Sequence, residues 1–321
     1  MTEPIICFGQ QPCGFFPKRF LVAKINTARA LQKEIGGSGA SAGGAKIVFF
    51  YHDSDADYRE TITVMKDTTT GAEVRLNFLQ ENKLQKKFSP LYAKRIPAGW
   101  QEEILKQLPR FANKPLIELF AETKEKTVAD FCLAMYQKMG LLDGIEILRS
   151  SNKTFREQAP DLAGEYFADV EYQNEVVRAK IELPAAPTTP PLGSARGTPP
   201  QQGGEAPQLS EDITRSLSPL SKIPTGASGL RGSPSRSEGE VVGVIHEGGN
   251  QFIRFPIAKP IEKWQKSAAR DQRFAWMQSV INCTHYIYGE GEKEYLNVSP
   301  FPNIKFIDRD KISDPNYAWL G

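Results

Sequence analysis

Polar residues and glycines follow two short apolar runs close to the beginning of the chain. Residues 9–14, Gly-Gln-Gln-Pro-Cys-Gly, follow the apolar run 4–8, and residues 52–60, with three aspartates and one glutamate, follow the apolar run 46–51. A strand, a loop and a helix in this order are typical of nucleotide binding, because the amino end of the helix attracts an anion such as phosphate or carboxylate. The spacing therefore indicates a ligand pocket, although an ordinary turn has the same composition.

The segment between these two polar clusters has the apolar period of a helix with one buried face. Its apolar residues recur at steps of three or four: Leu21, Ile25, Ala28, Leu31 and Ile35. Gly36 and Gly37 end the pattern, and Pro17 lies near the first turn, where its missing N–H costs little. A strand-helix-strand unit is nearly always right-handed with parallel strands, so both polar clusters should lie at the carboxyl edge of one sheet.

A third polar cluster follows an apolar run near the end of the chain. Gly289, Gly291 and Glu292 lie in a glycine-rich acidic turn, which suits a ligand that carries an amine or hydroxyl groups. Arg273 lies on the preceding segment, and an arginine can bind a phosphate or carboxylate with two parallel hydrogen bonds. The alternatives are a solvated loop and a surface arginine.

Composition excludes several classes of function. Lys and Arg total 40 against 38 Asp and Glu, so no global charge attracts nucleic acid or an anionic membrane. No apolar run approaches the roughly 20 residues that span a bilayer, and no signal-like segment opens the chain, so we expect a cytoplasmic protein. The four cysteines form no Cys-x-x-Cys pair and the three histidines lie in distant segments, so we expect neither a metal site nor a disulfide framework.

The segment 184–240 differs from the rest of the chain. It holds ten of the 23 prolines, many Gly and Ser residues and no aromatic residue. Such a composition cannot form a core, so we expect a disordered insertion between two folded parts. Residues 1–183 should form the first part of an α/β core, and residues 241–321 should form a small hairpin and complete that core.

Apolar spacing predicts further elements on both sides of this segment. Residues 115–139 have a mostly helical period, and residues 145–148 read as a buried strand that ends in the polar run 150–153. This run is a further strand end that could join the same cleft. Near the end of the chain, the runs 240–245 and 251–256 flank a turn and predict a hairpin.

The order of these polar clusters resembles that of the bacillithiol biosynthesis cysteine-adding enzymes. The loop Gly9-Gln10-Gln11, followed by Lys24, is similar to the Gly-Gln-Gln loop and the lysine near the start of that family. The segment Asp55-x-Asp57-Tyr58-x-Glu60 resembles its Asp-His-Asp-Phe-x-Glu segment.

The resemblance continues toward the end of the chain. Residues 139–148 look like the glycine-plus-strand segment of the family, and residues 242–255 look like its hairpin. Arg273 and the turn Gly289-Glu290-Gly291-Glu292, similar to a Gly-Pro-Gly-Glu turn of the family, complete the order. The resemblance thus touches most of the chain outside 184–240.

The resemblance implies a Rossmann-like parallel sheet of the class I aminoacyl-tRNA synthetase and nucleotidyltransferase type. It also implies an enzyme that joins cysteine, or a similar amino acid, to a small amine acceptor such as glucosamine-malate. Asp55, Asp57 and Glu60 would be catalytic, because a carboxylate could bind the amine of cysteine or act as base toward the acceptor. The implied binding residues are Gly9, Gln10, Gln11, Lys24, Arg273, Gly289, Gly291 and Glu292. ATP is the candidate cofactor, small molecules are the expected partners, and no metal ligand is implied.

Ala56 stands where the family has a histidine between the two aspartates, and His52 lies four positions upstream. This difference leaves two alternatives open. One is a catalytically silent module that binds a nucleotide and regulates a partner, and the other is a nucleotidyltransferase on the same core. The segment 184–240 stands where the family has a long helical coiled coil, and the sequence makes no prediction of oligomeric state.

Overall fold

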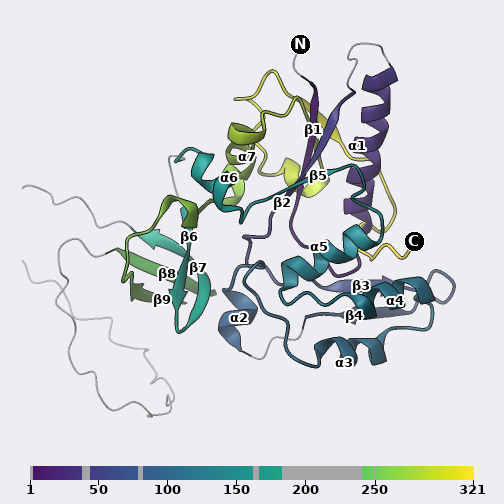
Figure 1. Cartoon of the computed structure of the whole chain (residues 1–321), viewed down its shortest axis with the longest axis horizontal. Helices are drawn as coiled ribbons and strands as arrows, with labels where there is room; N and C mark the ends of the chain where they lie inside the picture. The colour runs from purple at the N-terminus through teal and green to yellow at the C-terminus, as the bar shows by residue number, and fades with distance from the viewer. Residues whose placement is uncertain (1–2, 38–43, 79–81, 162–165, 183–240, 249–250) are drawn as a thin grey trace, which may run out of the picture. The chain divides into compact units, whose positions relative to one another are not determined.

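The structure is a computed structural model that describes residues 3–37, 44–78, 82–161, 166–182, 241–248 and 251–321 (Figure 1). Met1–Glu182 and Val241–Gly321 together form one compact unit. The predicted disordered insertion, 184–240, lies outside the described residues.

Five parallel strands form the central sheet, in the order β5-β2-β1-β11-β12. Their bounds are β1 (Ile5–Gln10), β2 (Lys46–Tyr51), β5 (Glu146–Arg149), β11 (His285–Tyr288) and β12 (Lys305–Asp308). The predicted α/β class with a parallel sheet is confirmed, and the first two strands lie where the apolar runs place them. The strand expected at 145–148 is β5, but it lies at the edge of the sheet, so its side chains are at most partly buried.

Both faces of this sheet are covered, because successive side chains of a strand point to opposite faces. Ile6 and Phe8 of β1 pack in one apolar cluster with helix α1 (Arg19–Gly37), whereas Cys7 packs in a second cluster with helix α7 (Arg273–Ile281). Figure 1 shows α1 and α7 on opposite sides of the strands. Burial on both faces explains why these strands are continuous apolar runs in the sequence.

Helix α1 forms as its apolar period predicts. Leu21, Ile25 and Ala28 are fully buried, and Leu31 and Ile35 pack at the edge of the same cluster. The helix therefore joins β1 to β2 across one face of the sheet.

The predicted helical stretch 115–139 consists of two helices, α4 (Lys114–Glu122) and α5 (Val128–Lys138). The side chain of Thr127 accepts a hydrogen bond from the backbone N–H of Asp130, which caps the second helix. Both helices bury aromatic side chains in the same cluster, where the rings of Phe120 and Phe131 lie 5.3 Å apart. This shared cluster is why the apolar period continues across the interruption.

A second, antiparallel sheet has the order β10-β6-β7-β8-β9. Its strands are β6 (Tyr166–Tyr172), β7 (Glu175–Glu182), β8 (Val242–Gly248), β9 (Gln251–Pro256) and β10 (Lys266–Ala268). The predicted hairpin is present as β8 and β9, but it is part of this larger sheet. Strands β6, β7 and β10 were not predicted. The alternation of apolar and charged residues in β7 is typical of a half-buried strand and is the signal that could have identified it.

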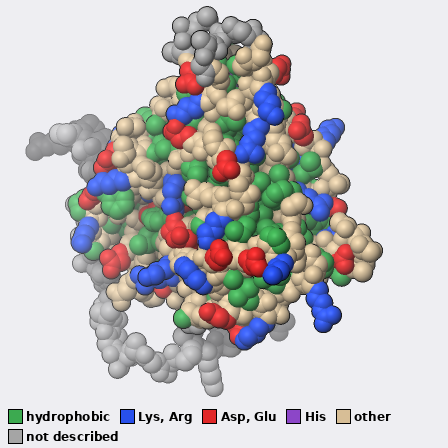
Figure 2. Space-filling model, turned by 45° about the vertical axis from the view of Figure 1, so that its right-hand side comes forward, with side chains coloured by type: hydrophobic (Ala, Val, Ile, Leu, Met, Phe, Trp, Pro, Cys, Tyr) green, Lys and Arg blue, Asp and Glu red, His purple; other side chains and the backbone are tan. Residues whose placement is uncertain are grey.

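The remaining elements are short. They are β3 (Thr63–Lys66), β4 (Glu73–Leu76), α2 (Lys83–Lys87), α3 (Trp100–Gln107), α6 (Lys153–Gln158), α8 (Glu290–Lys293) and the 3-10 helices η1 (Lys263–Gln265) and η2 (Arg270–Gln272). No helix in the described part of the chain is long and apolar enough to cross a membrane. Acidic and basic side chains are interspersed on the face shown in Figure 2, in keeping with the small net charge of the chain.

A buried carboxylate connects the ends of β2 and β5. Asp53 is fully buried and accepts hydrogen bonds from Arg149 Nε at 2.6 Å, from Ser150 Oγ at 3.1 Å and from the N–H of Ser151 at 2.8 Å. The Ser151 hydroxyl adds a bond of 2.6 Å. These contacts fix the backbone from which the polar loop after β2 begins.

We predict that Asp53→Ala lowers the free energy of unfolding by about 2 to 3 kcal/mol, because several donors would then be buried without an acceptor. Urea denaturation measures this loss. Asp161→Ala, at an exposed position, is the matched control and should change stability little. Equal stability of the two variants would contradict the structural role of Asp53.

Candidate functional site

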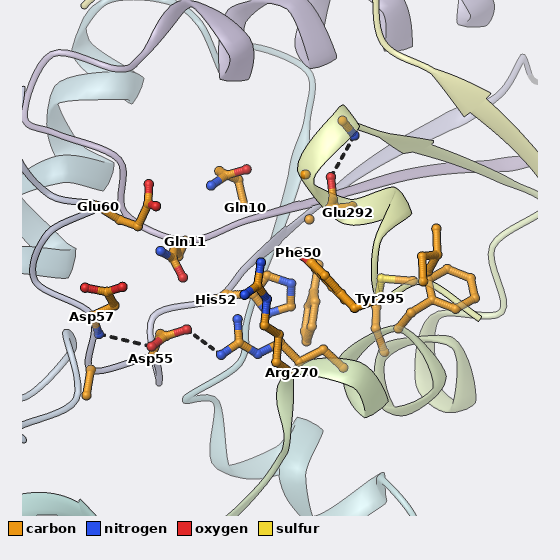
Figure 3. A pocket seen from close by; sticks show the side chains of 18 of the residues that line it. Gln10, Gln11, Phe50, His52, Asp55, Asp57, Glu60, Arg270, Glu292 and Tyr295 are labelled. Atoms are coloured by element: carbon orange, nitrogen blue, oxygen red, sulfur yellow. Dashed lines mark hydrogen bonds and ion pairs between the residues drawn. The ribbon is translucent and has the colours of Figure 1, made fainter. Parts of the chain in front are cut away.

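A pocket of about 710 Å³ lies at the carboxyl ends of β1, β2 and β11, and residues of β7, β8 and α7 complete its wall (Figure 3). All eleven site residues inferred from the sequence line it. They are Gly9, Gln10, Gln11, Lys24, Asp55, Asp57, Glu60, Arg273, Gly289, Gly291 and Glu292. The structure thus brings together segments that are separated by up to about 280 residues, while the role of each residue stays a prediction.

The hydroxyl of Tyr136 fixes the loop after β1 through two hydrogen bonds. It donates to Gly14 O at 2.7 Å and accepts from the N–H of Cys13 at 3.0 Å. Gly14 has a φ of 102°, and a Cβ there would lie 2.8 Å from Phe16 O. A side chain at this position is therefore excluded both by conformation and by space.

Lys24 connects β1 to the cluster after β11. Its ammonium group is buried, donates to Gly9 O at 2.8 Å and forms an ion pair with Glu292. Glu292 also accepts from the Tyr286 hydroxyl at 3.0 Å and from the N–H of Gly289 at 2.8 Å. The acidic turn predicted here is the single-turn helix α8, which this carboxylate caps.

The loop after β2 is positioned by a neighbouring segment. The N–H groups of Leu91 and Tyr92 donate to the carbonyl oxygens of Asp55 and Asp53 at 2.7 and 3.0 Å. The Nζ of Lys94 donates to Lys86 O at 2.8 Å and lies 3.3 Å from Ala56 O, and the Lys94 side chain is almost fully buried. Burial lowers the pKa of Lys94 to about 8, although the negative charges of Asp55 and Asp57 oppose this shift.

Asp55 forms an ion pair with Arg273 of α7. Burial alone would raise the pKa of Asp55, but the positive charges of Arg273 and Arg178 outweigh burial and hold that pKa well below its ordinary value. Asp55 is therefore an anion at every physiological pH, with a guanidinium group already bound to it.

Asp57 and Glu60 also have cationic partners. Asp57 binds the Nε and Nη2 of Arg59, both at 3.0 Å, and Glu60 lies 3.0 Å from the Nζ of Lys18. In Figure 3 both carboxylates stand on the same side of the pocket as Asp55, opposite Glu292. Each of the three carboxylates assigned a catalytic role from the sequence is thus engaged in an ion pair.

His52 also lines the pocket and carries no such partner. Its ring packs edge-to-face on Phe50, with the ring centres 4.5 Å apart, and in the described residues no hydrogen bond to the imidazole is found. Burial lowers the pKa of His52 well below its ordinary value, and the positive charge of Arg273 lowers it further. The imidazole is therefore neutral at pH 7.

Three pocket arginines were not identified from the sequence: Arg178, Arg270 and Arg309. None forms an ion pair with a carboxylate in the described part of the chain, although Arg178 donates to Ser54 O at 2.5 Å and Arg270 lies over the ring of Tyr295. Burial lowers the pKa of Arg178 to about 10, and Arg273 adds to this shift while Asp55 opposes it. No local motif marks these residues, because they come from β7, from η2 and from beyond β12.

The prediction that residues 150–153 join this pocket is wrong. None of them lines the pocket, since Ser150 and Ser151 bind Asp53 instead. Among the residues that the structure describes, no group of three or more His, Cys, Asp or Glu side chains is placed to hold a metal ion.

A scan against protein-family models finds no match for this sequence, and a search of curated proteins finds none either. The fold and the pocket therefore define this chain as an α/β protein with a charged pocket at the carboxyl edge of a parallel sheet. Its function is inferred from that pocket.

We predict that Gly9→Ala displaces His52, because a Cβ there would lie 2.8 Å from Nε2 of His52 and 3.0 Å from the Tyr286 hydroxyl. Overpacking of this kind lowers the free energy of unfolding by about 1 to 3 kcal/mol, which chemical denaturation measures. Gly36→Ala is the matched control, since nothing lies within 4 Å of that added Cβ. An equally small effect of both substitutions would show that His52 does not require Gly9.

We predict that Lys94→Met removes a pH dependence of stability. The pKa of Lys94 is about 8 in the folded chain and has an ordinary value of 10.5, so the unfolded chain binds more protons between these values. Wild-type stability should therefore rise by about 2 to 3 kcal/mol between pH 7 and 10 relative to the variant. Denaturation at several pH values measures the difference, and Lys138→Met, an exposed lysine, should follow the wild type. Parallel curves for wild type and Lys94→Met would contradict the burial of a charged lysine.

Proposed function

We propose that this pocket is the active site of an enzyme that forms a carbon–nitrogen bond, joining cysteine or a similar amino acid to a small amine acceptor such as glucosamine-malate. One observation carries the proposal. The eleven residues that match the bacillithiol cysteine-adding family come from separate segments of the chain, and all of them line a single pocket. Parallel strands gather the loops that follow them, and Lys24 and Arg273, which lie on two helices, line the same pocket.

The topology supports the finer fold assignment in this proposal. Counted in chain order, the strands of the parallel sheet have the order 3-2-1-4-5, and the order reverses between β1 and β11. Doubly wound nucleotide-binding folds have this order and bind their ligands at the carboxyl ends of the strands beside the reversal. We assign the chain to the Rossmann-like, class I aminoacyl-tRNA synthetase and nucleotidyltransferase type, with its core divided between residues 1–183 and 241–321.

The residues present fit ATP as the cofactor. Six basic side chains line the pocket against five acidic ones, and the ion pairs described above neutralise most of the acids. Arg309 Nε lies 3.5 Å from the position of a Cβ on Gly289, whereas Lys24 Cε and the carboxylate oxygen of Glu292, which form an ion pair, both lie at 3.7 Å. Arg309 is therefore the cation beside this backbone that suits a phosphate. ATP would supply the activation that a carboxylate needs before an amine can displace its oxygen.

The remaining site residues have roles in binding and orientation. Asp57 and Glu60 face the pocket and suit the ammonium group of an amino acid. Arg59, the present partner of Asp57, is exposed and contributes a weak surface contact, whereas Lys18, the partner of Glu60, is largely buried. Gln10 and Gln11 place amide donors and acceptors between these carboxylates and Glu292 (Figure 3). The unpaired arginines favour an acceptor or cofactor with negative charge.

A second candidate function has one observation in its favour. Because Asp55, Asp57 and Glu60 are all paired with cations and Ala56 replaces a histidine of the family, the pocket suits a silent module that binds a nucleotide to regulate a partner. A nucleotidyltransferase on the same core would instead release pyrophosphate from a nucleoside triphosphate. The same assay separates these outcomes.

We predict that the full chain, incubated with ATP, cysteine and glucosamine-malate, forms a covalent cysteine adduct detectable by mass spectrometry. Asp57→Asn and Gln11→Ala should lower turnover by at least about 100-fold, because both remove contacts that orient substrate, while their melting temperatures stay close to that of the wild type. Asp161→Asn, exposed and outside the pocket, should retain full turnover.

Turnover that is unchanged in Asp57→Asn and Gln11→Ala would contradict the proposal. A nucleotide that raises the melting temperature of the wild type without any turnover, across amino acids and acceptors, would favour the silent module. Pyrophosphate release without adduct would favour the nucleotidyltransferase.

A further inference from the structure

His52 is a half-buried side chain of the pocket that takes part in none of the ion pairs described above. His52 follows β2 directly, and its backbone N–H donates to Gln10 O at 3.0 Å, which anchors it against the loop after β1. Nε2 lies where a side chain at Gly9 would otherwise be, 2.8 Å from the Cβ position of that glycine. Figure 3 shows the ring between Asp55 and Glu292, facing the cavity.

The charges around His52 come from four different parts of the fold. Arg273 of α7, Lys24 of α1 and Arg178 of β7 are cations, and Asp55 is the anion that opposes them. The hydroxyl of Tyr286 from β11 is a neutral neighbour, because burial and the charge of Glu292 raise its pKa well above the ordinary value. Three cations against one carboxylate, in a partly desolvated site, keep the imidazole uncharged with a lone pair available.

The other groups that could accept a proton are already occupied. The carboxylates of Asp55, Asp57, Glu60 and Glu292 each accept from a cation. Glu290 and His246 line the pocket as well, but both side chains are exposed. Within the described chain, His52 is the pocket base that combines partial burial with a lone pair that no donor occupies.

We propose that His52 is the general base of this site and removes a proton from the acceptor amine. The inference rests on the proposed function. As the amine nitrogen attacks the carboxyl carbon of the amino acid, which a nucleoside triphosphate has activated, one N–H bond breaks and its proton passes to Nε2. The lone pair of the nitrogen forms the new C–N bond, and the electron pair of the broken N–H bond stays on nitrogen as its new lone pair. The leaving oxygen departs with the pair of the broken C–O bond, and His52 becomes an imidazolium ion.

Such a base need not have a high pKa. The attacking nitrogen becomes strongly acidic only as its bond to carbon forms, so a neutral imidazole with a lowered pKa can accept the proton at that stage. The cations around His52 then favour rapid loss of the proton to water and return of the neutral ring. This role differs from that of Asp57 and Glu60, whose carboxylates bind the substrate.

The test compares wild type with His52→Gln, which keeps a polar side chain of similar size but cannot accept this proton as a base. Steady-state kinetics use cysteine, ATP and glucosamine-malate between pH 5 and 9. We expect kcat to fall by about 100- to 10,000-fold with the KM for each substrate within about threefold. Because the imidazole stays neutral in this range, the loss of kcat should be similar at every pH. His285→Gln is the matched control, since His285 lies outside the pocket, and it should retain the wild-type profile.

A second variant separates catalysis from folding. In His52→Ala, added imidazole should restore part of kcat in proportion to its neutral fraction, which a purely structural role of His52 would not allow. Wild-type histidine NMR signals, assigned by their loss in His52→Gln, should include one imidazole that stays neutral well below pH 6.

Any of three results would overturn the base role of His52 and leave the proposed function standing. They are wild-type kcat in His52→Gln, an imidazole that is protonated at pH 7, and absence of any rescue in a folded His52→Ala. Absence of wild-type turnover with these substrates would instead reject the proposed function, and the base role with it.

Discussion

The parallel pairing of β1 with both β2 and β11 is the constraint on which the rest of this structure depends. Ile6 lies opposite Ile47 on one side and opposite His285 on the other, so strands almost 280 residues apart share one edge. Parallel strands end at the same edge of a sheet, and the polar segments that follow them are therefore gathered into one place. Lys24 stabilises this edge, because its ammonium group binds both Gly9 O at the end of β1 and Glu292 of α8, the helix after β11.

Burial of charge then determines the character of the site. Carboxylates taken out of water need cationic partners. Asp55, Asp57, Glu60 and Glu292 each have one, from another segment or from a neighbouring loop residue, whereas Glu290 is exposed. The arginines without carboxylate partners make the pocket receptive to anions. Burial, supported by the positive charge of Arg273, lowers the pKa of His52 and keeps it neutral. In the proposed function, these fixed anions and unpaired arginines would bind the small charged substrates.

The antiparallel sheet contributes to this pocket as well as to stability. Arg178 of β7 spans from its own sheet to Ser54 O beside β2 and stacks on Phe167 of β6. A buried ion pair also connects helix α6 to β6, with Arg156 Nη1 3.0 Å from Asp169 Oδ2. The second sheet is thus joined to the carboxyl edge of the first through guanidinium groups, and it supplies a wall of the pocket that the parallel sheet lacks.

The sequence by itself determined β1, α1 and β2, the hairpin and the three polar clusters, because apolar period and glycine spacing act between near neighbours in the chain. Only the tertiary structure decided that the three predicted carboxylates are paired, that Ser150 and Ser151 bind Asp53, and that Arg178 belongs to the pocket. It also decided that His52 is neutral. The physical reason is that ionisation depends on desolvation and on charges that distant segments bring within a few ångströms, and no local pattern records those distances.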